Sequence, residues 1–367
     1  MSTLSLHEFH QTQHATFGGV NGVEVVFHYG DVPAEHAALR GAAGVSDLSF
    51  RSRLCLLGGD RIKFLHGQVT NNVNSLQVGD GCYAALVNSK GKIQSDLNIY
   101  RLADELLLDF EPGLTAAVIA RLEKYVIADD VQLVDVASLY GLLSVQGPKA
   151  PEVVTALGLG VNLPAKPLQF STITDTMIGT VYLTRNERIG LPGFDLFVPT
   201  AALGAVADKL IAAAKAIGGR AIGWEAFEIA RIEAGRPRFG ADMDESNLAP
   251  ETGIESRAIS YSKGCYIGQE VIARVRTYGQ VAKALRGLRF AGELAVMPKT
   301  GDRLFAGDKE VGYLTSVTKS PALDAVIALG YVRREASEIG AEVAIQGDGA
   351  KAVARIVALP FAGQSDD

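Results

Sequence analysis

The chain has 367 residues, with 35 Lys and Arg against 41 Asp and Glu and a formal net charge of −6. Apolar residues make up 48% and charged residues 21%, a balance that excludes a disordered or fibrous protein and predicts two or three domains with buried cores. The negative charge also excludes bulk attraction to polyphosphate, so we expect no nucleic-acid partner.

Three cysteines lie far apart in the sequence, at Cys55, Cys82 and Cys265. An odd and sparse count argues against a disulfide framework, and a structural four-cysteine zinc site or a chain-ligated cubane iron–sulfur cluster would need about four thiolates. No apolar run reaches the roughly 18 residues of a membrane span, and no secretion signal is evident. We therefore expect a cytoplasmic protein that has no membrane partner.

In chain order, the residue pattern predicts helices at 33–40, 61–69, 114–127, 201–218 and 224–235, with another just after Pro148. Strands are predicted at 51–57, 82–87, 92–102, 105–110, 131–136, 140–147, 180–186 and 194–199. The loop Asn88–Gly91 joins two of these strands as a hairpin, with Asn and Gly where a positive φ is tolerated. From about residue 285 the pattern changes to short strands between turn residues, which is typical of a small β-barrel or sandwich.

The strand at 92–102 alternates apolar and polar side chains, and its polar face carries Gln94, Asp96 and Asn98. Exposure to solvent is the simpler explanation of that face. The alternative is that Asp96 lines a pocket, where its carboxylate could hydrogen-bond a nitrogen heterocycle or take a proton from an amine.

The stretch SKGCYIGQEVIARVR is the strongest local feature, because it sets Cys265 between two glycines and two residues after Lys263. If the segment is extended, the two side chains point to the same side, and a nearby ammonium favours a reactive thiolate. A helix that starts directly after the motif would favour the thiolate further. The alternative is a turn that holds a buried, inert cysteine.

Two clusters of charged residues are weaker signals. His7, His10 and His14 are spaced for one helical face, which can bind a metal but is more often a solvated face near a chain end. A run of cations without an intervening acid suits a small polyanion or a solvated linker better than nucleic acid. This run comprises Arg274, Arg276, Lys283, Arg286 and Arg289.

Several stretches in succession carry a resemblance to a known family: EHAALRGAAGVSDLS, FLHGQVTNNV, NSKGKIQSDLNIY, LPGFDLFVP, ARIEAGRPRFGADM and GYLTSVTKSPALDAVIALGYV. Their order along nearly the whole chain resembles the folate-binding YgfZ/GcvT-like family. That family includes the glycine-cleavage aminomethyltransferase (T-protein) and a YgfZ branch linked to iron–sulfur cluster assembly or repair. The stretch KGCYIGQE resembles the signature of the YgfZ branch.

The resemblance implies an α+β fold, with a folate-binding region of two intertwined subdomains over residues 1–284 and a small β-barrel over residues 285–367. It implies tetrahydrofolate, or a one-carbon derivative of it, as cofactor. Asp96 and Asp195 then match acids near the pterin, and Arg231 matches an arginine near the folate. Asp195 stands where T-proteins commonly have glutamate, and Ser95 where they often have a second acid.

The resemblance to the YgfZ branch implies a function in iron–sulfur cluster assembly or repair, with iron–sulfur proteins or assembly factors as partners. Cys265 would then be the reactive thiol, with Lys263 and Asp96 as the other catalytic residues. The alternative is a folate-dependent aminomethyltransferase or methyltransferase, in which Asp96 accepts the proton of a substrate amine and Cys265 is structural.

Overall fold

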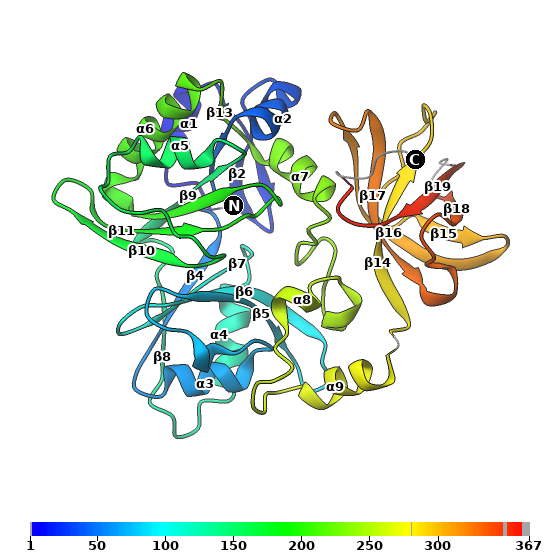
Figure 1. Ribbon diagram of the computed structural model, residues 1–367, viewed down its shortest axis with the longest axis horizontal. Helices are drawn as coiled ribbons and strands as arrows, with labels where there is room; N and C mark the ends of the chain where they lie inside the picture. The colour runs from blue at the N-terminus through cyan, green and yellow to red at the C-terminus, as the bar shows by residue number, and fades with distance from the viewer. Residues whose placement is uncertain (1, 280, 348–350, 362–367) are drawn as a thin grey trace. The chain divides into compact units, whose positions relative to one another are not determined.

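The computed structural model describes residues 2–279, 281–347 and 351–361, and these residues form two compact units (Figure 1). The first unit comprises the described residues up to Leu86, then Ser95–Phe227 and Ala258–Ile267. The second comprises Val87–Gln94, Glu228–Arg257 and the described residues from Gly268 onward. Among all these residues, no helix has both the length and the apolar composition of a membrane span.

A five-stranded and a six-stranded sheet form the framework of the first unit. The five-stranded sheet has the order β5-β6-β7-β4-β8 and comprises β4 (Ser52–Leu57), β5 (Gly81–Val87), β6 (Ile93–Arg101), β7 (Leu106–Phe110) and β8 (Gln132–Asp135). The six-stranded sheet has the order β10-β11-β12-β9-β3-β13. It comprises β3 (Gly44–Asp47), β9 (Tyr140–Gln146), β10 (Phe170–Asp175), β11 (Gly179–Arg185), β12 (Gly193–Pro199) and β13 (Arg220–Ala221). A separate hairpin pairs β1 (Thr16–Val20) with β2 (Val23–His28).

Helices cover one apolar face of each large sheet. Leu54, Leu97 and Leu108 of the five-stranded sheet belong to one core with residues of α3 (Arg61–Gln68) and α4 (Thr115–Glu123). The six-stranded sheet forms a second core with α5 (Ala150–Thr155) and α6 (Leu203–Ala216). The remaining helices are α1 (His7–Thr12), α2 (Val32–Gly41), α7 (Trp224–Glu233), α8 (Glu255–Ala258) and α9 (Gln269–Tyr278). The other face of the five-stranded sheet carries the polar side chains of β6 and β7, and Tyr100 of this face contacts Phe170 and Phe197 of the six-stranded sheet.

The C-terminal strands of the second unit close into a barrel of order β14-β17-β16-β15-β18-β19 (Figure 1). They are β14 (Lys283–Phe290), β15 (Arg303–Ala306), β16 (Lys309–Ser320), β17 (Ala325–Arg333), β18 (Glu342–Gln346) and β19 (Lys351–Val357). Side chains such as Leu288, Leu314 and Ile356 fill its core and are fully buried. The predicted α+β class with a C-terminal barrel is therefore confirmed.

The elements that the sequence predicts are present, but the prediction omits several short ones. It misses β3, β10 and the β1–β2 hairpin, whose residues include Gly, Ser and Thr and lack a long apolar run. The helical spacing of the N-terminal histidines does not correspond to one helix: α1 ends at Thr12, and His14 has a φ of 61°, outside the helical region. The three N-terminal histidines therefore do not share a helical face.

Candidate functional site

The β5–β6 hairpin determines where Asp96 points. Its turn forms as predicted, because Gly91 has a φ of 70° and its N–H donates to the Asn88 carbonyl at 2.9 Å. Leu97 and Ile99 are fully buried in the core on one side of β6. Side chains alternate along a strand, so Asp96 and Asn98 lie on the opposite, polar face.

Asp96 has one satisfied and one unsatisfied carboxylate oxygen. The Tyr83 hydroxyl donates to Oδ2 at 2.8 Å. Oδ1 is buried and accepts no hydrogen bond from any residue that the structure describes. Burial and the negative charge of Glu111 raise the pKa of Asp96 to about 6, although Tyr83 and Arg51 act against this. A carboxyl group with a pKa near neutrality is suited to accept a proton.

A chain of alternating charges runs beside Asp96. Arg51 Nε donates to Asp109 Oδ1 at 2.7 Å, and its Nη1 donates to Glu111 at 2.5 Å. Arg188 Nη2 donates to Asp109 Oδ2 at 2.7 Å, and its Nε donates to Asp195 Oδ2 at 2.8 Å. Burial alone would raise the pKa of Asp109, but the two guanidinium groups hold it below its usual range.

Asp195 lies at the far end of this chain of charges. It is fully buried on β12, where Arg188 and the Asn186 amide donate to its Oδ2. Burial raises the pKa of Asp195 despite the arginine. Asn98, two residues after Asp96, donates to Asp109 at 2.9 Å. Both predicted acids thus lie in one unit, and bonds run from Asp195 through Arg188 and Asp109 to Asn98, two residues from Asp96.

Lys263 and Cys265 have different environments. Lys263 is 6% exposed, and its Nζ donates to the carbonyls of His66 and Val69, each at 2.5 Å, at the end of α3. Burial lowers the pKa of Lys263 to about 8. Cys265 is exposed, and the residues just before it form a turn and a bend rather than an extended strand. The condition for the two side chains to share a side is therefore not met.

Cys265 differs in exposure from the other two thiols. Cys55 is buried, and burial raises its pKa above the usual range. Burial also raises the pKa of Cys82 to about 12. Of the three cysteines, Cys265 is the exposed one, so the expectation of a buried cysteine at this position is wrong, whereas a reactive thiol remains a prediction.

Arg231 lies in the second unit, on α7, and is 3% exposed. Its guanidinium bonds Asp242, donates to Glu228 at 2.8 Å and donates to Ser316 of β16 at 2.8 Å. These contacts fasten α7 to the barrel. A role of Arg231 toward folate remains a prediction.

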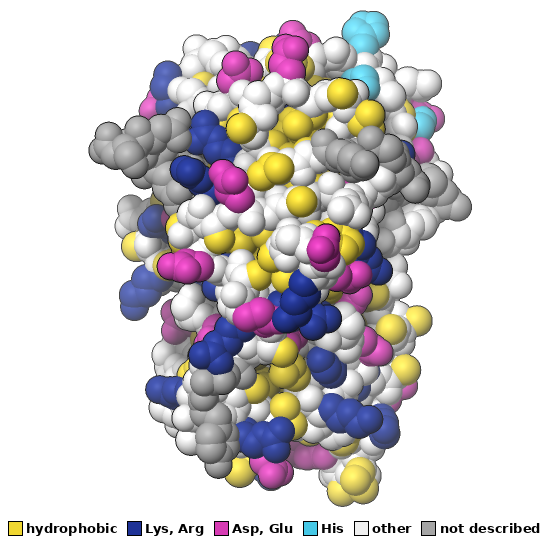
Figure 2. Space-filling model, turned by 90° about the vertical axis from the view of Figure 1, so that its right-hand side faces the viewer, with side chains coloured by type: hydrophobic (Ala, Val, Ile, Leu, Met, Phe, Trp, Pro, Cys, Tyr) yellow, Lys and Arg dark blue, Asp and Glu magenta, His cyan; other side chains and the backbone are white. Residues whose placement is uncertain are grey.

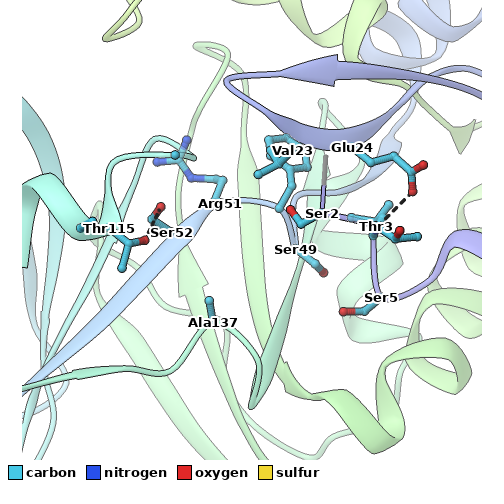
Figure 3. Close-up of a pocket in the computed structure, with 14 residues that line it drawn as sticks. Ser2, Thr3, Ser5, Val23, Glu24, Ser49, Arg51, Ser52, Thr115 and Ala137 are labelled. Carbon is cyan, nitrogen blue, oxygen red and sulfur yellow. Dashed lines mark hydrogen bonds between the residues drawn. The ribbon is translucent and has the colours of Figure 1, made fainter.

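One cavity of the first unit, with a volume of about 310 Å³, adjoins the chain of charges (Figure 3). Arg51 and Glu24 both line it, and Val23 and Ser2 lie between them (Figure 3). The lining comprises Ser2, Thr3, Leu4, Ser5, Val23, Glu24, Ser49, Phe50, Arg51, Ser52, Gly113, Thr115, Ala116 and Ala137. None of the five predicted site residues is among them.

Two of the N-terminal histidines, His7 and His10, form hydrogen bonds within the protein. His7 bonds Glu24 at 2.8 Å, and the buried His10 bonds both Asp47 at 2.9 Å and the Tyr29 hydroxyl at 2.8 Å. Across the described part of the chain, no three His, Cys, Asp or Glu side chains are grouped to hold a metal. On the face drawn in Figure 2, basic and acidic side chains are interspersed.

The sequence did not single out Arg51, Tyr83, Asp109, Glu111 or Arg188 as site residues. One signal was available: Asp109 interrupts the apolar run LLLDF, and a charge inside such a run needs a partner. The partners themselves could not be found in this way, because Arg51 and Arg188 are distant in the chain and meet Asp109 only after folding.

Comparisons with known proteins agree with this architecture. A family model described as the GCVT N-terminal domain matches residues 6–263, and one described as the glycine cleavage T-protein C-terminal barrel domain matches residues 283–362. The aminomethyltransferase of Saccharopolyspora erythraea is 31% identical over 97% of this chain and 96% of its own. That of Halalkalibacterium halodurans is 29% identical over 91% of this chain and 90% of its own.

A solved structure has a similar fold over the full length. The crystal structure of glycine cleavage system aminomethyltransferase T from Bartonella henselae superimposes with a TM-score of 0.88 at 25% identity. The match covers 99% of this chain and 98% of the other. These matches support the predicted GcvT-like family, whereas the YgfZ branch remains a prediction.

Proposed function

We propose that this chain, which belongs to the family of the GCVT N-terminal domain and carries the T-protein C-terminal barrel domain, is a tetrahydrofolate-dependent aminomethyltransferase. Tetrahydrofolate is the cofactor of this family, as the sequence predicts. The relatives named above are aminomethyltransferases that match the chain almost from end to end. The alternative that the sequence left open is thus better supported than the iron–sulfur function.

The observation that carries the proposal is the buried Oδ1 of Asp96, which lacks a hydrogen-bond partner among the described residues. A buried polar atom without a partner is costly, so such an atom in a native protein calls for an explanation. A ligand with an N–H group facing Oδ1 would satisfy it. The pterin of tetrahydrofolate is rich in such donors, so the residues present fit this cofactor.

When bound, tetrahydrofolate would supply the nitrogen that accepts the one-carbon unit. Asp96 would hold the N–H group at Oδ1 and take up the proton that this nitrogen loses as it accepts the one-carbon unit, while ammonia and the thiol of the carrier leave. Tyr83 would keep the carboxylate oriented through its bond to Oδ2, which leaves Oδ1 free for the ligand. Arg51 and Arg188 hold Asp109 in place beside β6 and so keep this polar face rigid.

The test is a turnover assay with an aminomethyl-lipoyl carrier protein and tetrahydrofolate, in which methylene-tetrahydrofolate and ammonia are measured. We expect the wild type to form both products. Asp96→Asn should lower kcat by about 100-fold or more, because a general base contributes roughly that factor. A wild type that binds tetrahydrofolate yet releases no ammonia from the carrier would contradict the proposal.

A function in iron–sulfur cluster assembly or repair is the second candidate, and the exposed sulfur of Cys265 is the observation that favours it. Under this candidate, a cytoplasmic protein would act on iron–sulfur proteins or assembly factors. Cells that carry Cys265→Ala should then lose several cluster-dependent enzyme activities together, while the purified variant still binds tetrahydrofolate. Normal cluster enzymes in those cells would count against this candidate and leave the aminomethyltransferase proposal intact.

A further inference from the structure

The register of β6 and β7, continued past its last paired residues, points Glu111 toward Asp96. In the antiparallel pair β6–β7, Asn98 lies opposite Asp109. When this register is continued by two residues, Asp96 lies opposite Glu111, which directly follows the end of β7. Residues that face each other in this way share one side of the sheet, with Cβ atoms about 4.5–5.5 Å apart. Glu111 is 4% exposed, so little water separates its charge from Asp96.

The groups around Asp96 shift its pKa in opposite directions: Glu111 raises it, whereas Tyr83 and Arg51 lower it. Tyr83 donates to Asp96 from β5, and Arg51, which precedes β4, favours the ionised carboxylate. Arg51 divides its guanidinium between Glu111 and Asp109, so it does not cancel the charge of Glu111 at Asp96.

The six-stranded sheet adds one more cation and one more acid to these surroundings. Arg188 and Asp195 are connected to the polar face of β6 through Asp109, which Arg188 and Asn98 both contact. They form an ion pair with each other, and neither is among the groups that chiefly set the pKa of Asp96. Glu111 is therefore the main negative charge that opposes ionisation of Asp96.

We propose that Glu111 is a positioning residue that sets the proton affinity of Asp96, the proton acceptor of the proposed transfer on which this inference rests. Two carboxylates that share a site with little water do not both ionise freely. Glu111 is bonded to Arg51, and Asp96 is the carboxyl group that holds a proton at higher pH than an ordinary aspartate does. Glu111 thus keeps Asp96 able to take and return a proton near neutrality.

The test follows the carboxyl groups directly, by ¹³C NMR of the full chain labelled at the Asp and Glu carboxyl carbons. Asp96→Asn assigns the Asp96 signal. In Glu111→Gln, the pKa of Asp96 should fall by about 1, because a like charge at this range is removed. Glu111→Asp keeps the charge and should retain most of the wild-type behaviour. Glu123→Gln removes an acid from the exposed side of α4 and should change nothing.

An Asp96 titration in Glu111→Gln that superimposes on the wild-type curve overturns the inference. If Glu111→Gln does not fold, the wild type carries the test: the Glu111 signal, assigned with Glu111→Asp, should respond over the pH range in which Asp96 ionises. A Glu111 signal that is constant through that range overturns the inference as well. These readouts need neither folate nor turnover, so failure of the aminomethyltransferase assay would contradict the proposed function alone.

Discussion

Asp96 has a raised pKa in the folded protein, and this has a consequence for stability. The pKa is about 6 in the fold against 3.8 for an ordinary aspartate, so the folded state binds this proton more tightly than the unfolded state does. The contribution of this bound proton to the free energy of unfolding is fully present below pH ~4 and is lost as the pH rises through about 6.

Asp96→Asn should therefore be more stable than the wild type at pH 7.5, by about 1–3 kcal/mol, because it carries no charge to bury. At pH 4 the two proteins should unfold alike, since Asp96 is then protonated in the fold. Urea unfolding at both pH values measures this difference, with Asp104→Asn as an exposed control. Equal stability of the variant and the wild type at pH 7.5 would be inconsistent with a buried charge at Asp96.

Asp109 should behave in the opposite way. It is fully buried between Arg51 and Arg188, and its lowered pKa means that its stabilising contribution is present at neutral pH and lost in acid. Asp109→Asn leaves two buried guanidinium groups without their shared carboxylate and should cost about 3–5 kcal/mol at pH 7. Thermal or urea unfolding would detect this loss, and a variant that unfolds like the wild type would show that the chain of charges contributes little.

At the scale of elements, local patterns predicted the β5–β6 hairpin well and β10 poorly. The Asn88–Gly91 loop and the strict alternation of β6 are local signals, and they also indicated the face on which Asp96 lies. Strand β10, FSTITD, has one buried side chain near its middle, Ile173, so its pattern is weak without the neighbouring strand β11. The sequence could not predict whether the polar face of β6 is exposed to water or lines a pocket, because the answer depends on which other sheet packs against it.

The segment Ala258–Ile267 also has a structural role that the sequence did not indicate. The side chain of Lys263 satisfies two carbonyls at the end of α3, and the Ile267 N–H donates to the Gly67 carbonyl at 3.1 Å. The sequence pattern predicts a chemical role for Cys265, but Lys263 of the same motif caps the end of α3.

Lys263→Met should therefore cost about 2–3 kcal/mol, because it leaves two buried carbonyls without donors. Cys265→Ala, two residues away, should change stability by less than about 0.5 kcal/mol, as expected for an exposed position. Urea unfolding of both variants makes the comparison. A larger loss for Cys265→Ala than for Lys263→Met would reverse the roles assigned to them here.

At the scale of the whole molecule, the sequence predicted the fold class, the terminal barrel and the family, because long ordered series of motifs carry that information. It did not predict the chain of charges from Arg51 to Asp195. Its members come from strands and loops of two sheets, and only tertiary contacts bring them together. The predicted role of Asp96 rests on this assembly, since neighbouring charges and burial set its affinity for a proton.

The most direct test of the account is the pH dependence of aminomethyl transfer to tetrahydrofolate by the wild type and by Asp96→Asn. We expect kcat/KM of the wild type to fall tenfold per pH unit below about pH 6, as Asp96 becomes protonated, and the variant to be nearly inactive throughout. Transfer by Asp96→Asn at the wild-type rate, or a wild-type rate that stays constant down to pH 4, would contradict the account.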